Sequence, residues 1–246
     1  MLSADELAAY RRDGFVVARA VLSAAEVAAL HADAERMWRE AEGDPTRPGV
    51  HWRKHETLGR VADRLDPVCP ISKAFSAIAH DPRLITLAAD ALGARGAFFK
   101  DKLIMKPPGA FGYALHHDYA YWTGLGVTAD EFVSLFVALD ASEPTSGALE
   151  LFPGLHRREL PVHPDDPLDI DPAALEGEQS CIPTLAAGDV LIFHSLMPHR
   201  SAPNRSALPR RAYILTYMDA RHAGLVDAND PERRKVVYRA LSRDQV

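Results

Sequence analysis

Residues 115–119 read Leu115-His116-His117-Asp118-Tyr119, and the rest of the chain is organised around them. The stretch places an imidazole and a carboxylate two residues apart, directly after a strand-like run. Because side chains alternate along an extended backbone, we expect His116 and Asp118 to point to one side and His117 to the other. This spacing predicts the first half of a metal site.

The second half of the metal site is expected at His199, which follows another strand-like run at residues 190–193. His194 ends that run and is the alternative ligand. Two imidazoles and one carboxylate on one face of an octahedral ion leave coordination positions open, which is typical of non-haem Fe(II) oxygenases. Fe(II) also needs donors that are deprotonated at neutral pH, and neutral histidines and an aspartate supply them.

The composition is that of a globular protein. The chain has 246 residues, of which 47% are hydrophobic and 25% are charged, and this predicts a single domain over residues 1–246. The net charge of −6 and the pI near 6.0 argue against a nucleic-acid partner and against a polybasic membrane surface. We interpret a locally basic cluster from Arg205 to Arg211 as an anion-binding site.

The sequence also indicates where the protein works. Cys69 and Cys181 form no Cys-x-x-Cys pair, so neither a zinc site nor a disulfide framework is predicted. No apolar run approaches the roughly 18 residues of a membrane span, and the first residues lack the basic start and the apolar core of a signal peptide. We therefore expect a cytoplasmic protein without membrane association, as a monomer or a small homo-oligomer.

Helices dominate the first part of the predicted fold, a buttress over about residues 1–95. Residues 3–6 and 23–26 have the Ser-x-x-Glu form of a capping box, and each opens an alanine-rich helical stretch. The second helix is expected from about Ala24 to Ala41. A third helix follows the cap at Asp81-Pro82 and ends at Gly93. A short strand is predicted between the first two helices, at residues 14–21.

Strands dominate the second part, a β core over about residues 96–218. Apolar runs bounded by turn residues predict strands at residues 97–106, 132–139, 148–152, 190–193 and 212–217. Helices first and short strands afterwards predict a mainly β fold with flanking helices, either a sandwich or a barrel. The acidic, proline-rich residues 161–179 are expected to form an inserted loop, and a C-terminal helical tail is predicted at residues 231–241.

Several motifs in a fixed order carry a resemblance to a known family. They are Lys-Pro-Pro-Gly at 106–109, His-His-Asp-Tyr-Ala-Tyr-Trp at 116–122, Ser-Gly-Ala-Leu-Glu-Leu-Phe-Pro-Gly-Leu-His at 146–156, Gly-Asp at 188–189, and His-Arg-Ser-Ala-Pro-Asn-Arg-Ser at 199–206 with an arginine at 210. From about Leu2 to Tyr217 the sequence resembles the phytanoyl-CoA dioxygenase-like family of Fe(II)/2-oxoglutarate-dependent oxygenases. The resemblance implies a double-stranded β-helix core of the jelly-roll, cupin-like type.

The resemblance also implies the cofactors and the metal ligands. Fe(II) is the expected metal, 2-oxoglutarate the expected co-substrate, and His116, Asp118 and His199 the expected ligands and catalytic centre. The family pattern favours His199 over His194. In most relatives the middle residue of the first motif is glutamine, so His117 departs from the family pattern.

2-Oxoglutarate is a dianion, so its end far from the metal needs a buried cation. A guanidinium suits this need because its planar fork meets a carboxylate bidentately. Arg210 lies at the spacing of the family's co-substrate arginine. Arg211 is the alternative, and on a strand the two side chains face opposite ways. The resemblance further implies co-substrate contacts for Ser201 and Ser134, and Lys102 is an additional candidate.

Aromatic residues near the metal motif predict the substrate pocket, which we expect to take a modest, partly apolar small molecule. The candidates are Tyr113, Tyr119, Tyr121, Trp122, Trp52 and Arg53. Residues 42–66 carry prolines and glycines and lack periodicity. We therefore expect them to be irregular, either as a solvated loop or, at residues 43–58, as a lid over the active site.

The expected function is oxidation of a small molecule by O2, with hydroxylation as the default outcome and with release of succinate and CO2. A biosynthetic or secondary-metabolite substrate is expected. Epimerisation, desaturation and cyclisation use the same iron site and stay open, whereas halogenation is disfavoured because Asp118 occupies the position that a halide needs. A cupin-like metal-binding protein without turnover is the alternative from another class. A zinc hydrolase is disfavoured because the sequence has no His-Glu-x-x-His motif.

Overall fold

The computed structural model describes residues 1–55, 57 and 59–225 of the chain. The helices are α1 (Ala4–Asp13), α2 (Ala24–Gly43), α3 (Lys73–Ala79) and α4 (Pro82–Leu92). The strands are β1 (Phe15–Ala18), β2 (Val50–His55), β3 (Gly59–Leu65), β4 (Gly96–Ile104), β5 (Tyr113–His116), β6 (Phe132–Ala138), β7 (Leu149–Leu151), β8 (Val190–His194), β9 (His199–Ser201) and β10 (Ala212–Asp219). The helical tail predicted at residues 231–241 lies outside the described residues.

The helix ends follow the predicted capping chemistry. Ser3 and Ser23 each accept a hydrogen bond from the backbone N–H of the glutamate three residues later, and both capping boxes are complete. The Asp81 side chain caps α4, which ends at Gly93 in the left-handed conformation with a φ of 65°. These predicted boundaries are therefore confirmed. Among the described residues, no helix combines the length and the apolarity needed to cross a bilayer.

The strands form two antiparallel sheets. Within the described residues there is a seven-stranded sheet in the order β1-β8-β6-β10-β4-β3-β2 and a three-stranded sheet in the order β5-β9-β7. Phe136 and Phe193 of the large sheet pack with Leu151 of the small sheet in one buried cluster. Two antiparallel sheets with a shared interior and helices outside are the architecture of the predicted jelly-roll core.

Strand β10 separates this interior from the helical layer. Ile214 belongs to the inner cluster, whereas Tyr213 and Leu215 belong to the cluster that includes the helices. β10 lies between β6 and β4 and pairs with both of them. Because the side-chain period of a strand is two, the inward row continues back to Arg210 and the outward row to Arg211.

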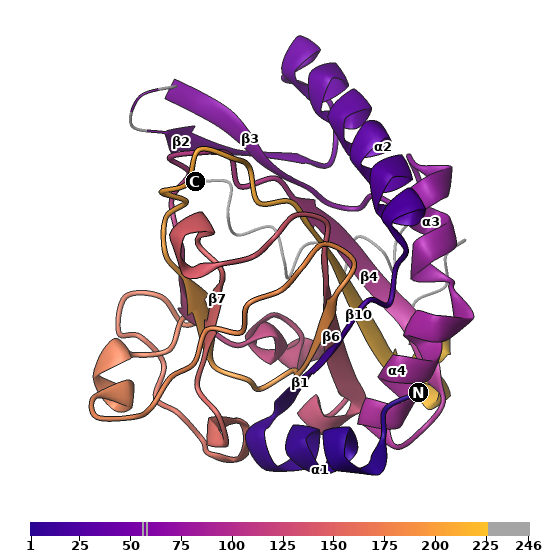
Figure 1. The fold of residues 1–246 in the computed structure, drawn as a ribbon. Coiled ribbons are helices and arrows are strands. Elements are labelled where there is room, and N and C mark those ends of the chain that lie inside the picture. Colours follow the sequence, from indigo (N-terminus) through magenta and orange to yellow (C-terminus); the bar gives the residue numbers. More distant parts are fainter. Residues whose placement is uncertain (56, 58, 226–246) are drawn as a thin grey trace.

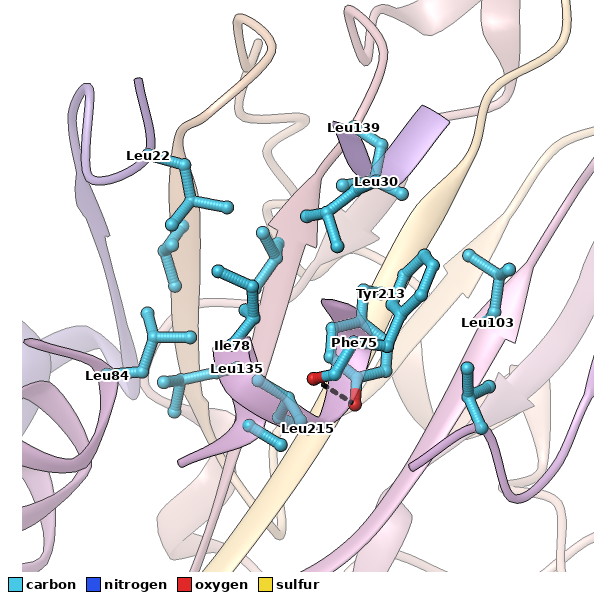
Figure 2. Packing of buried hydrophobic residues seen from close by; sticks show 14 of the residues in the cluster. Leu22, Leu30, Phe75, Ile78, Leu84, Leu103, Leu135, Leu139, Tyr213 and Leu215 are labelled. Atoms are coloured by element: carbon cyan, nitrogen blue, oxygen red, sulfur yellow. Dashed lines mark hydrogen bonds between the residues drawn. The ribbon is translucent and has the colours of Figure 1, made fainter. Parts of the chain in front are cut away.

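The main hydrophobic core lies between the large sheet and helices α2, α3 and α4, which cover one face of that sheet (Figure 1). Phe75 of α3 is fully buried. Its ring meets the ring of Tyr213 edge-on, with 4.7 Å between the centroids. The Tyr213 hydroxyl donates to the backbone carbonyl oxygen of Phe75 at 3.3 Å (Figure 2). This packing fixes the position of β10 against the helices. It therefore also fixes the β10 side chains, such as that of Ile214, that point into the interior between the two sheets.

Residues 50–65 contradict the irregular structure that the sequence predicts over residues 42–66, whereas the lid at residues 43–58 stays a prediction. They form a hairpin of β2 and β3 at one edge of the large sheet (Figure 1). The strands pair from Val50 opposite Leu65 to His55 opposite Gly59, where glycine adopts a φ of 76° at the turn. β2 reads Val-His-Trp-Arg-Lys-His and lacks alternating apolar residues. Hydrophobic periodicity therefore does not reveal this strand.

Replacement of Phe75 by alanine tests the outer core. We expect Phe75→Ala to lower the free energy of unfolding by about 3–5 kcal/mol, because it removes a fully buried ring and leaves a cavity. Urea denaturation followed by circular dichroism measures this change. Leu208→Ala is the control, since that side chain is 72% exposed, and it should change stability by less than about 0.5 kcal/mol. Similar losses in the two variants would contradict this description of the core.

Candidate metal centre and co-substrate slot

The three predicted metal ligands lie together in the interior. His116 ends β5, His199 begins β9, and these two residues are Cα partners in the β5–β9 pair. Asp118 begins the short 3-10 helix η1 (Asp118–Tyr121). One potential ligand atom from each residue lies within 4.8 Å of the other two. A single strand pair thus joins the His-x-Asp motif to a histidine far away in the sequence.

Backbone hydrogen bonds orient both imidazoles. Nδ1 of His116 donates to the carbonyl oxygen of Ala114 at 2.8 Å, and Nδ1 of His199 donates to that of Met197 at 2.9 Å. A ring nitrogen that faces a carbonyl oxygen carries the proton, so Nε2 of each neutral ring keeps a lone pair for a metal. Metal-binding histidines are commonly held in this way.

The charges of the three side chains also suit a divalent metal. Burial lowers the pKa of His116 to about 4 and lowers the pKa of His199, so both imidazoles are neutral at pH 7. Burial alone would raise the pKa of Asp118, but the Lys102 ammonium and the two imidazoles together lower it to about 2. Neutral imidazoles and an ionised carboxylate are the protonation states that a metal ion requires.

Ser134 lies against the metal site, although the sequence predicts it as a contact of the co-substrate. It is fully buried on β6, and its hydroxyl donates to Oδ2 of Asp118. A hydrogen bond of this kind fixes the orientation of a ligating carboxylate. The nitrogen and oxygen donors, their burial and their hydrogen-bonded support all fit Fe(II).

The other two histidines of these motifs point elsewhere. Nδ1 of His117 accepts the backbone N–H of Ala120 and so caps η1. His194 places Nε2 at 3.0 Å from a carboxylate oxygen of Asp130. Neither histidine belongs to the cluster of potential ligands found within the described part of the chain. The geometry therefore favours His199 over His194.

Arg210 is buried two residues before the start of β10, with only 1% of its surface exposed. Its Nη2 donates to the carbonyl oxygen of Gly147 at 3.0 Å, and the guanidinium lies 5.3 Å from the centre of the Phe136 ring. Among the described residues, its Nε has no hydrogen-bond partner. Burial lowers the pKa of Arg210 to about 10, so the side chain stays charged at pH 7. A buried guanidinium with an open N–H suits a carboxylate ligand.

Arg211 faces the helical layer instead. Its Nε and Nη2 donate to the carboxylate of Asp140 at 2.8 and 2.9 Å, and its Nη1 donates to Glu35 of α2 at 3.0 Å. The charge of Arg211 is therefore already neutralised by two carboxylates. Of the two adjacent arginines, Arg210 is the one that reaches the interior.

A cavity of about 940 Å³ lies over the metal site, and His116, Asp118 and Lys102 line it. Four residues that the sequence predicts for the substrate pocket also line it: Trp52, Arg53, Tyr113 and Trp122. Tyr121, the further aromatic candidate, is part of the same wall. The volume lies within the range of about 300–1,000 Å³ that is usual for small-molecule sites.

Tyr119 is a correction to the predicted substrate pocket. Its hydroxyl donates to the carbonyl oxygen of Val127 at 2.8 Å, and its ring packs near Phe132 in a buried cluster outside the cavity. Tyr119 follows Asp118 directly in the 3-10 helix η1, where adjacent side chains point about 120° apart, so it does not share the direction of the Asp118 side chain. Trp122 belongs to both environments, because it packs on Phe132 and also lines the cavity.

Comparison with known proteins identifies the family. Residues 10–212 match the model of the family Phytanoyl-CoA dioxygenase (PhyH). The chain belongs to the PhyH family. An ectoine dioxygenase from Bordetella bronchiseptica is 30% identical in an alignment of 241 residues that covers 88% of this chain and 75% of that protein. Dioxygenase lolE1 from Epichloe uncinata is 35% identical over 154 residues, which are 63% of this chain, and the match spans 56% of the length of that relative.

Solved structures agree with this family. The non-heme alpha ketoglutarate dependent epimerase SnoN from nogalamycin biosynthesis has a TM-score of 0.72 and 26% identity, with 88% of this chain and 82% of SnoN covered. EctD from S. alaskensis, crystallised with 2-oxoglutarate and 5-hydroxyectoine, has a TM-score of 0.75 at 24% identity, with 89% and 77% covered, and shows the shared fold. The predicted PhyH membership, jelly-roll fold and class of 2-oxoglutarate-dependent dioxygenase are thus confirmed.

Lys106, the first residue of the motif Lys-Pro-Pro-Gly, is a functional residue for which the sequence analysis predicts no role. Its Nζ donates to Oγ of Ser201 at 2.8 Å and to the carbonyl oxygens of Gly147 and Ala202 at 2.9 and 2.5 Å. The Gly147 carbonyl oxygen also accepts from Arg210, so Lys106 links Ser201 to the arginine. A lysine before two prolines could have indicated this role, because proline ends a strand and lets the side chain turn inward.

The metal centre predicts a spectroscopic difference between two histidine variants. Anaerobic addition of Fe(II) and 2-oxoglutarate is expected to give the weak visible charge-transfer band of the chelate. His199→Ala should abolish the band because it removes one ligand, whereas the matched variant His194→Ala should keep it. Retention in His199→Ala together with loss in His194→Ala would show that the wrong histidine has been assigned.

The two adjacent arginines predict different affinities for 2-oxoglutarate. Removal of one partner of a buried charge pair costs about 2–5 kcal/mol. Arg210→Ala should therefore weaken binding by roughly 30-fold or more. Arg211→Ala is the control, because its side chain binds Asp140 and Glu35 outside the interior. Calorimetric titration of the metal-loaded protein measures both variants, and a larger loss in Arg211→Ala would contradict the assignment.

Proposed function

We propose that this PhyH-family protein is an Fe(II)/2-oxoglutarate-dependent dioxygenase that hydroxylates a small molecule. In the balanced reaction, a C–H bond of the substrate, O2 and 2-oxoglutarate give the alcohol, succinate and CO2. One observation carries the proposal: the cluster of His116, Asp118 and His199, in which Asp118 and His199 are buried, occurs together with a buried arginine, Arg210, that has an unused N–H group. A metal-binding protein without turnover has no need of such an arginine.

Different residues would bind the metal and the co-substrate. Nε2 of His116, Nε2 of His199 and the carboxylate of Asp118 would hold Fe(II), and Ser134 keeps the carboxylate oriented. Bound Fe(II) supplies the centre at which O2 is activated and a C–H bond is oxidised. We assign Arg210 to the far carboxylate of 2-oxoglutarate.

Ser201 and Lys102 complete the proposed co-substrate slot. Ser201 is held by Lys106 beside Arg210, so its hydroxyl is positioned for the same carboxylate. Lys102 is the Cα partner of Ile214, an inward-facing residue of β10, and it lines the cavity together with His116 and Asp118. Its ammonium would therefore face the end of 2-oxoglutarate that lies nearer to the metal.

The cavity wall would bind the substrate. Trp52 and Arg53 of β2, Tyr113 of β5 and Trp122 surround the space above the metal ligands. The guanidinium of Arg53 lies 4.8 Å from the centre of the Tyr113 ring, which stiffens this part of the wall. A closed, shaped site places one C–H bond and limits the entry of water.

Epimerisation is the second candidate reaction, because SnoN is described as an epimerase and is 26% identical to this chain. The same ligands and co-substrate slot would serve it. We further propose that the protein acts in the cytoplasm as a monomer or a small homo-oligomer, without a nucleic-acid partner. The net charge of −6 supports the last point.

Consumption of 2-oxoglutarate and formation of succinate, followed by NMR, test the proposed function. The Fe(II)-loaded protein should convert 2-oxoglutarate to succinate in the presence of O2. His199→Ala should remove this turnover because it lacks one metal ligand. Turnover that persists at the wild-type rate in His199→Ala, or its absence from the wild-type protein, would contradict the proposal.

A tryptophan variant separates substrate binding from co-substrate binding. Trp52→Ala should leave Fe(II) and 2-oxoglutarate binding nearly unchanged, because Trp52 lies in the cavity wall and not among the ligands. With a compound that raises turnover, the ratio of product to succinate should fall. Trp38→Ala is the matched control, since Trp38 packs against the outer core on α2. Equal ratios in Trp52→Ala and the wild-type protein would show that Trp52 does not position the substrate.

A further inference from the structure

Strand β3 of the hairpin contains a β-bulge at Asp63. Arg64 and Ala62 pair with adjacent residues of β2, so Asp63 lies between them as the extra residue of the bulge. Its carbonyl oxygen accepts the backbone N–H of Met105, directly after β4, at 3.1 Å. A bulge changes the direction in which a side chain leaves its strand. In this protein it allows a carboxylate of the hairpin to reach a residue of the small sheet.

The residue that the Asp63 side chain reaches is Tyr113, the first residue of β5. The Tyr113 hydroxyl donates to Oδ2 of Asp63 at 2.6 Å, and Asp63 is buried. Burial and the negative charge of Asp63 raise the pKa of Tyr113, so its hydroxyl keeps the proton and remains the donor. The guanidinium of Arg53 lies 4.8 Å from the centre of the Tyr113 ring. The hairpin therefore fixes the Tyr113 side chain at both its ring and its hydroxyl.

The backbone of Tyr113 contacts the proposed co-substrate slot. Tyr113 is the Cα partner of Ser201 on β9, and its N–H donates to Oγ of Ser201 at 3.3 Å. Nζ of Lys106 donates to the same oxygen at 2.8 Å. A hydroxyl oxygen has two lone pairs, and these two donors occupy both of them. The proton of the Ser201 hydroxyl therefore stays available for a carboxylate of the co-substrate.

Lys106 connects this serine to the buried arginine. Nζ of Lys106 and Nη2 of Arg210 both donate to the carbonyl oxygen of Gly147, at 2.9 and 3.0 Å. Gly147 has a φ of 72°, and a Cβ at this position would lie 2.6 Å from Nζ of Lys106. The groups around the slot are thus packed closely, and a shift of one of them displaces the next. A continuous set of contacts leads from Asp63 to Arg210.

We propose that Asp63 is a positioning residue for 2-oxoglutarate. Asp63 fixes the hydroxyl of Tyr113, and the Tyr113 N–H together with Lys106 orients Ser201 toward the far carboxylate of the co-substrate. Asp63 also lines the cavity in which the substrate would bind. The hairpin therefore takes part in co-substrate binding as well as in substrate binding. This inference rests on the proposed function, because it adds a residue to the same co-substrate slot.

Two 2-oxo acids test the proposal in the Fe(II)-loaded protein under anaerobic conditions. 2-Oxoglutarate carries the far carboxylate, whereas pyruvate keeps the 2-oxo acid group that chelates the metal and lacks the far carboxylate. The visible charge-transfer band reports the binding of each. Tyr113→Phe removes only the hydroxyl, and it should weaken 2-oxoglutarate binding about tenfold, the effect of one hydrogen bond to a charged group. Pyruvate binding should change by less than about twofold, because the affected contact is absent.

Variants of Asp63 then show whether the two side chains act through one bond. Asp63→Ala should match Tyr113→Phe, and the double variant should bind 2-oxoglutarate no more weakly than either single variant. Asp63→Asn keeps an acceptor oxygen and should stay within about threefold of the wild-type protein. If Asp63→Ala does not fold, Tyr113→Phe and Asp63→Asn decide the question.

Tyr119→Phe is the matched control. It also removes the hydroxyl of a tyrosine that packs in a buried cluster, but this hydroxyl donates to the carbonyl oxygen of Val127, and the cluster lies outside the cavity. The variant should bind both 2-oxo acids as the wild-type protein does. A loss of 2-oxoglutarate binding as large as that in Tyr113→Phe would mean that any loss of packing has this effect, and it would overturn the proposal.

The outcomes separate this inference from the proposed function. The role of Asp63 is wrong if Tyr113→Phe binds 2-oxoglutarate as tightly as the wild-type protein, or if it weakens 2-oxoglutarate and pyruvate equally. The same conclusion follows if the losses add in the double variant, or if Asp63→Asn loses as much as Asp63→Ala. If neither 2-oxo acid gives the band in the wild-type protein, the proposed function itself is wrong.

Discussion

The pairing of β5 with β9 is the constraint on which the site depends. It sets His116 opposite His199 as Cα partners, with 4.3 Å between the ring centroids. Two buried imidazoles so close together cannot both be charged, and their lowered pKa values keep them neutral. The carboxylate of Asp118 enters the same space because His117, which lies between the two ligands, is still extended, with φ −127° and ψ 147°. A metal ion is the natural partner of two lone pairs and one negative charge.

The two faces of the large sheet differ in polarity. The outer face buries apolar side chains under α2, α3 and α4, and Figure 2 shows how closely they pack. The inner face instead carries charged and polar groups, several of which have no hydrogen-bond partner among the described residues. Such groups cost free energy in the folded state. The outer core supplies the stability that allows the inner face to remain polar. Strand β10 contributes side chains to both faces, with Tyr213 and Leu215 on the outer face and Ile214 on the inner face.

The sequence predicts the parts of the site that follow from local alternation. His116 and Asp118 share a side because they are two residues apart, and Arg210 and Arg211 face opposite ways because they are adjacent in the segment that leads into β10. The capping boxes predict the ends of α1 and α2 for a similar reason. These inferences need only the chemistry of neighbouring residues.

The rest depends on contacts between distant segments. The partner of Ser134 is Asp118 on another element, which no local pattern reveals. The pairing of Lys100 with Asp66 is of the same kind. The hairpin at residues 50–65 was missed because its strands are polar on an inner face that lines a cavity, so the usual apolar alternation is absent. The prediction for Tyr119 rests on nearness to the metal motif, and nearness in the sequence does not show which way a side chain points.

The β2–β3 hairpin is attached to the rest of the large sheet by a short pairing between β3 and β4. In this pairing Arg64 lies opposite Ile104, and Leu65 lies opposite Leu103. It supplies one wall of the cavity, whereas the metal ligands and Arg210 belong to other segments. In the proposed function, the hairpin residues of the cavity wall would therefore contact the substrate from a different segment than the one that holds the metal. The hairpin contacts the segment of His116 through two hydrogen bonds, from the Tyr113 hydroxyl to Asp63 and from Arg53 to the Gly112 carbonyl oxygen, and substitutions elsewhere in the hairpin would leave these contacts in place. This separation gives a physical basis for evolvability, in a family whose members are named for molecules as different as ectoine and methylphosphonate.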